Sequence, residues 1–327
     1  MVVANSNPRA NMSRRASRPQ IRLIEIQPAP RLEDRVVCRI INTKLTDDLE
    51  FFALSYLVGE ATSTETISIN DTKTSVPSSL SEAVRHIREA LKSDIARSEP
   101  TPRWLLRAVK HMRVVFPDLM SCGAIRLWAE TLCIDQNNPR ELAERRVIMS
   151  QVYASAKMVI GWLGPSDEYT DDFLAFLKVA EEYMPPNYGD PGDKEKNPQD
   201  YAPHHVWLSN KILEGFWRSP RHMEALHRFY DLPYLHRCWL LEEISQSRFP
   251  TFMLGTAMIP WMTILRMTKC REELVDQPSD VFPDKYRTSL KLPPLEALQT
   301  FLADLQKRHL TAAPFNTKQS TSSKGSA

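Results

Sequence analysis

Two side chains in the second half of the chain have the types and spacing of a ligand site. Trp239 and Glu243 are four residues apart in a stretch, Leu232–Ile244, whose pattern predicts a helix, so they would be stacked neighbours on it. An indole face beside a carboxylate can hold a ring and a hydroxyl-bearing ligand. An equally good interpretation packs Trp239 beneath the polar segment 185–203 and leaves the acid solvated.

Arg237 lies just before this pair, and its position predicts a carboxylate partner. On a helical wheel of residues 235–246 it falls inside the apolar arc, and a buried guanidinium needs a carboxylate. Glu130 and Asp135 are the candidates. Both lie at or beyond the carboxyl end of a predicted strand, which is where open α/β sheets bind ligands.

The segment 127–164 must position these acids. Residues 125–133 are rich in apolar side chains and predict a strand, and residues 158–163 predict a second strand that is covered on both faces. Strand, helix and strand in so short a span predict a right-handed crossover in a parallel sheet. The helix between them begins with an N-cap residue, a first-turn proline and an acid that can reach back to the cap: Asn138, Pro139 and Glu141.

One cation on this helix has two interpretations. The helical period places Arg145 on the predicted buried face. It can snorkel to solvent or pair with Glu141 one turn earlier. Alternatively, it is a buried cation that requires a carboxylate or an anionic ligand. The other residues of that face are Leu142, Met149, Val152, Tyr153 and Ala156.

Further elements alternate between strand and helix patterns. Strands are predicted within 21–41 and at 51–59, 66–70 and 249–254, and helices at 80–91, 171–183, 207–230 and 258–274. Residues 93–123 predict an elaborated loop and residues 185–203 a mobile surface loop. The fold class is therefore α/β, with a mainly parallel central sheet flanked by helices and with helical and loop insertions.

The pattern also predicts domain limits. Residues 1–24 carry five arginines and no acid, which is typical of a disordered tail, although a mitochondrial transit peptide has a similar composition. The α/β domain is expected at 25–275. Residues 276–327 are expected to form a poorly structured extension.

Composition excludes several classes of protein. The net charge of +2 and the lack of a clustered basic face argue against nucleic-acid binding, and no apolar run is long enough to span a membrane. The five cysteines are odd in number and form no C-x-x-C pair, so we interpret them as reduced thiols in a cytoplasmic protein.

Cofactor motifs are also missing. The nine glycines form neither a Walker loop nor a dinucleotide fingerprint, so no glycine-rich cradle for a nucleotide is expected. The histidine spacings at 204–205 and at 222 and 227 do not match a metal site. We predict no metal and no bound cofactor.

Three blocks of the sequence resemble the fungal heterokaryon incompatibility (HET) domain, over roughly residues 50–256. They are ALSYLVG at 53–59, LWAETLCIDQ at 127–136, and RCWLLEE at 237–243. The positions that depart from the family pattern are Val58, Glu130, Asp135, Arg146 and Glu242.

The resemblance implies a role in fungal non-self recognition that ends in programmed cell death, a form of innate immunity. HET domains are thought to be similar to TIR domains, some of which cleave NAD with a helix-borne glutamate four residues after a tryptophan. Carried over, Glu243 becomes the candidate catalytic acid, and NAD is the implied substrate rather than a cofactor. The candidate substrate-binding residues are Ser55, Tyr56, Glu130, Asp135, Gln136, Arg237 and Trp239.

The chemistry is plausible on its own terms. Cleavage of the nicotinamide–ribose bond develops oxocarbenium character on the ribose, and a nearby carboxylate stabilises that charge. The alternative function is a non-catalytic signalling module that self-associates or binds other death-signalling proteins. An α/β hydrolase is disfavoured because the chain has no G-x-S-x-G elbow.

Overall fold

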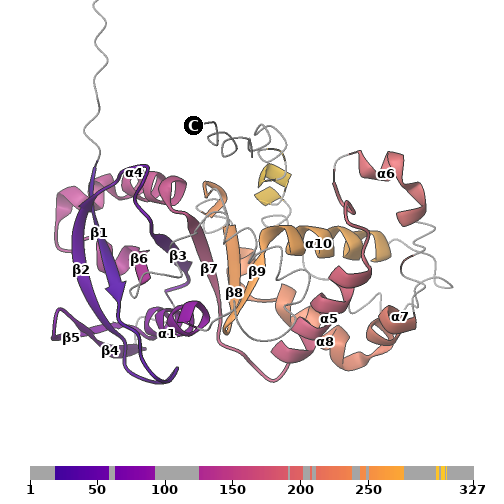
Figure 1. Ribbon diagram of the computed structural model, residues 1–327, viewed down its shortest axis with the longest axis horizontal. Helices are drawn as coiled ribbons and strands as arrows, with labels where there is room; N and C mark the ends of the chain where they lie inside the picture. Colours follow the sequence, from indigo (N-terminus) through magenta and orange to yellow (C-terminus); the bar gives the residue numbers. More distant parts are fainter. Residues whose placement is uncertain are drawn as a thin grey trace, which may run out of the picture.

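A computed structural model gives the fold. It describes residues 19–58, 63–92, 125–190, 192–201, 207, 211–237, 244–247, 250–275, 300–301, 303–305 and 307. A mixed sheet, with α1 and α4 beside it, lies next to a cluster of helices formed by α5 to α8 and α10 (Figure 1). In the described part of the chain, no helix is long and apolar enough to cross a membrane.

The elements have the following bounds. The strands are β1 (Gln20–Ile26), β2 (Val37–Lys44), β3 (Phe52–Tyr56), β4 (Thr64–Ile69), β5 (Thr72–Pro77), β6 (Ile125–Ala129), β7 (Met158–Gly164), β8 (Pro250–Leu254) and β9 (Ala257–Pro260). The helices are α1 (Ser78–Lys92), α3 (Glu130–Cys133), α4 (Pro139–Ser155), α5 (Thr170–Tyr183), α6 (Asp193–Lys196), α7 (Lys211–Arg218), α8 (Pro220–Tyr230) and α10 (Trp261–Val275), with short 3-10 helices η1 (Pro198–Asp200) and η3 (Pro233–His236).

The sheet has the order β5-β4-β2-β1-β6-β3-β7-β8-β9. Its centre, β6-β3-β7-β8, is parallel throughout, and β2 and β4 are also parallel. The other four pairings are antiparallel. The prediction of α/β architecture is confirmed, but the sheet is mixed rather than mainly parallel. Hairpins at both flanks, β1-β2, β4-β5 and β8-β9, add the antiparallel strands.

Helices α1 and α4 cover opposite faces of the parallel centre. His86 of α1 lies against Trp162 of β7, and Tyr153 of α4 packs edge-on against Trp128 of β6. Trp162 is in register with Tyr56 of β3, whereas Trp128 is in register with Ala53, three residues earlier on the same strand. Because side chains alternate along a strand, the two tryptophans point to opposite faces.

Several predicted element bounds are corrected. The strand predicted at 125–133 ends at Ala129, because the next residues form one helical turn in which Ile134 N–H donates to Glu130 O (2.9 Å). The last helix begins at Trp261, since Gly255, at φ 56°, allows a tight turn and residues 257–260 return as β9. The helix predicted at 207–230 is interrupted by Ser219, which caps α8.

The segment 185–203 is not a mobile surface loop in its described part. Tyr188 and Tyr201 are buried and stacked, with ring centroids 4.7 Å apart. The Tyr201 hydroxyl donates to Asp193 and accepts from Gly189 N–H, both at 2.8 Å. Arg266 of α10 donates to Pro185 O at 2.6 Å. These bonds fasten the segment to the helical cluster, so the expectation from its polar composition is wrong.

Described residues on both sides of the expected domain, 25–275, also have defined structure. Strand β1 begins at Gln20, within the segment expected to be a disordered tail, and its alternating pattern pairs it with β2 and β6. Near the other end, Phe301 and Leu305 are buried, and the Phe301 ring lies edge-on to Phe252 of β8. Phe301 and Leu305 of the C-terminal extension therefore contribute to the core.

A buried arginine holds the loop between β1 and β2. Arg88 of α1 is only 1% exposed, and its guanidinium donates to four backbone carbonyls of the loop, at 2.8 to 3.3 Å. The carbonyls belong to Arg31, Leu32, Asp34 and Arg35. Partly buried carbonyls need donors, so this one side chain supplies hydrogen bonds that water would otherwise have to make.

We expect Arg88→Met to lower the free energy of unfolding by about 2–4 kcal/mol, because four partly buried carbonyls lose a charged donor at once. Urea unfolding measures this. The control is Arg35→Met in the same loop, where the side chain is exposed and a change below about 0.5 kcal/mol is expected. Equal effects of the two substitutions would contradict the role of Arg88.

Candidate functional site

The carboxyl ends of β6 and β3 bring several polar side chains together. Strand β6 ends at Ala129 and is followed at once by Glu130 and Thr131, while β3 ends at Tyr56. The Tyr56 hydroxyl lies 2.6 Å from the Thr131 hydroxyl, so the two share a hydrogen bond. Burial of its ring raises the pKa of Tyr56 to about 12, and the Glu130 charge acts in the same direction. Tyr56 is therefore a neutral hydroxyl at physiological pH.

Glu130 is paired with Arg145 of α4. Arg145 Nε lies 2.5 Å from one carboxylate oxygen and Nη2 donates to the other at 3.0 Å, which is a bidentate contact. The Glu130 side chain is 21% exposed and that of Arg145 is 48% exposed. Burial raises the pKa of Glu130 above its ordinary value, although Arg145 acts to lower it.

This pair corrects the expectations for the first turns of α4. Arg145 does not pair with Glu141, and it is half-exposed rather than a buried cation. Leu142, expected on the buried face, is exposed, whereas Met149, Val152 and Tyr153 are buried as predicted. Only the second half of α4 is buried against the sheet, so the buried stripe does not extend to its first turns.

The N-terminus of α4 is capped as the sequence predicts. The Asn138 side chain accepts from the N–H groups of Arg140 and Glu141, and Pro139 is the first helical residue. Glu141 accepts from the Asn138 side-chain amide at 3.4 Å and from the backbone N–H of Asp135 at 2.8 Å. Arg22 of β1 also pairs with Glu141 and donates to Cys133 O, so β1 fixes this turn.

Asp135 and Gln136 lie in the exposed turn between α3 and α4. The Asp135 carboxylate accepts from Asn137 N–H at 2.9 Å, and the Gln136 amide donates to Ile134 O at 3.1 Å. Both side chains shape the turn locally. Among the described residues, no hydrogen bond or ion pair joins either of them to Glu130.

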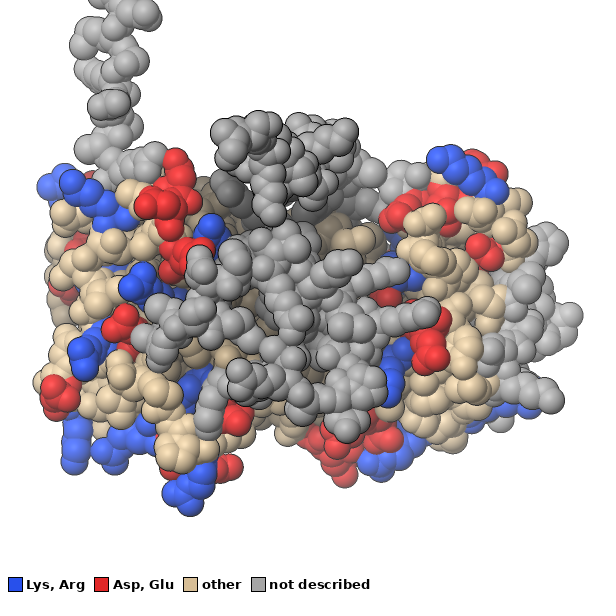
Figure 2. Space-filling model, in the orientation of Figure 1, with Lys and Arg blue, Asp and Glu red and all other residues tan. Residues whose placement is uncertain are grey.

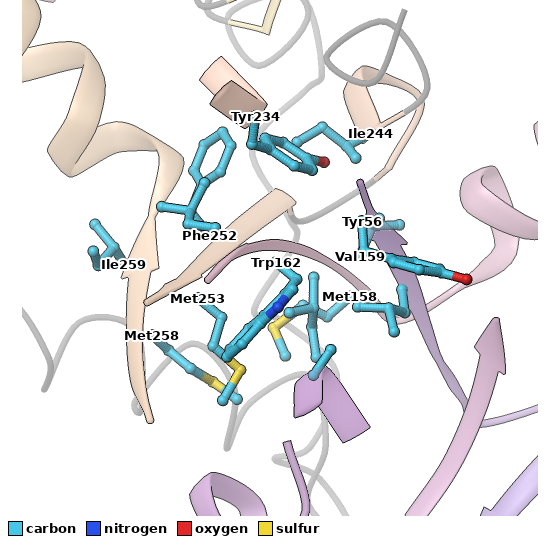
Figure 3. Close-up of a cluster of buried hydrophobic side chains, with 14 of the residues drawn as sticks. Tyr56, Met158, Val159, Trp162, Tyr234, Ile244, Phe252, Met253, Met258 and Ile259 are labelled. Atoms are coloured by element: carbon cyan, nitrogen blue, oxygen red, sulfur yellow. The ribbon is translucent and has the colours of Figure 1, made fainter. Parts of the chain in front are cut away.

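Ser55 faces the opposite side of the sheet from Tyr56. It is 2% exposed and accepts a hydrogen bond from the Tyr234 hydroxyl at 2.8 Å. Tyr234, on η3, lies over Gly161 of β7, where an added Cβ would be 2.9 Å from the hydroxyl oxygen. Figure 3 shows Tyr234 above the sheet with Phe252 and Ile244, on the side away from Trp162. A ligand could reach Ser55 only by displacing Tyr234.

The third block is only partly described. The predicted helix from Leu232 does not continue to Ile244, because η3 ends at His236 and Arg237 is extended, with φ −100° and ψ 94°. Arg237 is exposed, so its expected place in a buried arc is wrong. Trp239, Glu242 and Glu243 lie outside the described residues, and their expected roles stay predictions.

The stretches on either side of residues 238–243 are fixed to the sheet and to α4. Before them, Tyr234 is bound to Ser55 at the end of β3. After them, Ile244 is fully buried and Gln246 accepts a hydrogen bond from Ser150 of α4 at 2.5 Å. Both anchors belong to the described part of the chain.

Sequence reasoning missed Thr131, Tyr234 and the pairing of Arg145 with Glu130. Thr131 lies inside the second block, directly after Glu130, and a search for hydroxyls at strand ends would have found it. The other two contacts join residues 15 and 179 positions apart, and no local pattern signals them. The described residues contain no group of three or more side chains that could hold a metal ion.

The three blocks lie within a match to a known protein family. The family model for the heterokaryon incompatibility protein (HET) matches residues 51–243, more than half of the chain. The chain belongs to the HET family. In this HET domain, the first block supplies β3 with Ser55 and Tyr56, and the second block supplies β6, α3 and the turn that leads to α4.

A characterised relative matches a larger part of the sequence. Heterokaryon incompatibility protein 6, OR allele, of Neurospora crassa is 24% identical over 293 residues, which cover 79% of this chain. The match covers 38% of that protein, so the HET chain spans less than half of its relative's length. No solved structure matches the HET chain significantly.

The raised pKa of Glu130 makes a prediction about pH. Because the folded carboxyl binds its proton more tightly than the unfolded one, its contribution to stability is greatest below the ordinary glutamate pKa of about 4.3 and declines as pH rises through the folded value. Urea unfolding from pH 4 to 8 should therefore show that the HET domain loses stability relative to Glu130→Gln as pH rises. Glu144→Gln, which removes an exposed acid of α4, is the control. If the wild type instead gained stability relative to Glu130→Gln as pH rises, the raised pKa of Glu130 would be contradicted.

Proposed function

We propose that this HET domain acts in fungal non-self recognition and that its activity ends in programmed cell death. The match of the HET family model over residues 51–243 carries the proposal, and the Neurospora crassa heterokaryon incompatibility protein supports it. The aligned part is 38% of that relative, so the support from it concerns the matched region alone.

We further propose that the domain cleaves NAD at the nicotinamide–ribose bond, with Glu243 as the carboxylate that stabilises the oxocarbenium ion. HET domains are thought to be similar to TIR domains, some of which have this activity. The site supports the proposal in two ways. Parallel strands end beside the partly buried acid Glu130, at the edge where α/β sheets bind ligands. Tyr234 and Gln246, on either side of Glu243 in the sequence, are bound to β3 and α4.

The substrate contacts follow the same reasoning. Glu130 and Tyr56 present a carboxylate and a neutral hydroxyl at the strand ends, suited to the hydroxyls of a ribose. Trp239 would stack on a ring of the substrate. Asp135, Gln136 and Arg237 are exposed side chains that would contact the ligand at the margin of the site.

Expression in a Neurospora crassa host tests both levels of the proposal. Inducible expression of the full chain should arrest growth, admit a vital dye, and lower cellular NAD before the cells die. Glu243→Ala should slow NAD loss about 100-fold or more and suppress death, because removal of a catalytic carboxylate typically has an effect of this size. The variant must accumulate to the wild-type level and unfold at the wild-type temperature.

Glu144→Ala is the matched control, since it removes an exposed acid of α4 and should leave death and NAD loss unchanged. Death that persists in Glu243→Ala at constant NAD would overturn the enzymatic proposal and support a non-catalytic module that works by self-association or partner binding. Normal growth of cells that express the wild type would contradict the cell-death role itself.

A further inference from the structure

The Glu130–Arg145 contact leaves part of the guanidinium unused. Nε and Nη2, along one edge of the Arg145 fork, are taken by the two Glu130 oxygens. The end of the fork, formed by Nη1 and the second Nη2 hydrogen, has no protein partner among the described residues. With its side chain 48% exposed, Arg145 can present this end to a solute. Two parallel N–H groups in such a fork match two oxygens of a phosphate.

Glu130 has spare capacity as well. A carboxylate has about four acceptor positions, and Arg145 fills two of them. The side chain is only 21% exposed, so little water is available for the remaining positions. The desolvation that raises the pKa of Glu130 reflects the same shortage of donors. Hydroxyl groups of a ligand would supply the missing hydrogen bonds.

A contribution to the stability of the fold does not by itself explain this ion pair. An ion pair at the protein surface typically contributes between about zero and 1 kcal/mol. Here the pair joins the first residue after β6 to α4 and stands beside the Tyr56–Thr131 hydroxyl pair. The carboxyl ends of adjacent parallel strands are where such sheets bind ligands.

The charge of the chain also argues for a specific contact. The net charge is only +2, and Figure 2 shows basic and acidic side chains intermixed over the described part of one face. A general attraction of the chain for anions is therefore weak. Binding of a phosphate at Arg145 would depend on the geometry of the fork rather than on a basic field.

We propose that the Glu130–Arg145 pair is a binding site for a phosphorylated ribose, in which the free end of the Arg145 fork binds phosphate oxygens and Glu130 accepts from the ribose hydroxyls. Glu130 also holds Arg145 in the orientation that this contact requires. This assignment rests on the proposed function, because NAD contains both groups, but it concerns binding and needs no turnover.

Calorimetric titration of the purified full chain with ADP-ribose, the phosphorylated product of NAD cleavage, tests the site. Arg145→Ala should weaken binding about 10- to 100-fold, since hydrogen bonds between charged groups are lost. Arg145→Lys should recover only part of the affinity, because an ammonium lacks the fork. Glu130→Gln should weaken ADP-ribose binding more than binding of inorganic pyrophosphate, which has no hydroxyls.

Arg140→Ala is the matched control, because Arg140 is an exposed arginine on the same helix in an ion pair with Glu144, and its loss should leave binding unchanged. Absence of ADP-ribose binding by the wild type, or wild-type affinity in Arg145→Ala, overturns the site. Binding through Arg145 without release of nicotinamide from NAD would leave the site intact and refute the proposed cleavage. Cleavage of NAD by the wild type, together with wild-type affinity of Arg145→Ala for ADP-ribose, would refute the site and leave the proposed cleavage intact.

Discussion

The hydrogen bond between Tyr234 and Ser55 is the contact on which the arrangement of this HET domain depends. It joins the end of the helical cluster to the central strand of the parallel sheet, and it is completely buried. The Tyr234 ring fits there only because Gly161, in register with Ser55 on the neighbouring strand, has no side chain. One glycine on β7 therefore decides how closely the segment that begins at η3 can approach the carboxyl ends of the strands.

The packed side chains around Ser55 and the polar side chains at the strand ends differ in their accessibility. On the face of Ser55, side chains are packed and apolar, and Tyr234 and Phe252 shut out ligand (Figure 3). At the ends of β6 and β3, in contrast, Glu130 and Arg145 remain partly accessible next to the Tyr56–Thr131 hydroxyl pair. Antiparallel hairpins widen the sheet on both flanks without disturbing this edge, because they pair with the outer sides of the parallel centre. Arg145 belongs to α4, which covers the face of Trp128 and Ser55, so the packed side chains and the ion pair lie on the same side of the sheet.

Sequence reasoning succeeded where the signal is local. The cap at Asn138 and the buried strand β7 were predictable because capping and apolar runs are properties of a few consecutive residues. It failed where partners come from distant segments. The wheel that buried Arg237 assumed a helix that ends at His236, and the composition of segment 185–203 concealed a buried pair of tyrosines. The pairing of Glu130 with Arg145 joins α3 to α4 across the intervening turn, and only the folded chain reveals it.

The most direct test of the central contact is a double-mutant cycle of Gly161→Ala and Tyr234→Phe, with the free energy of unfolding measured in urea. The added methyl group would lie 2.9 Å from the Tyr234 hydroxyl, so Gly161→Ala alone should cost about 1–3 kcal/mol. Its cost should be clearly smaller in the Tyr234→Phe background, where the hydroxyl and its bond to Ser55 are already gone. Strict additivity, or a Gly161→Ala protein as stable as the wild type, would contradict the account.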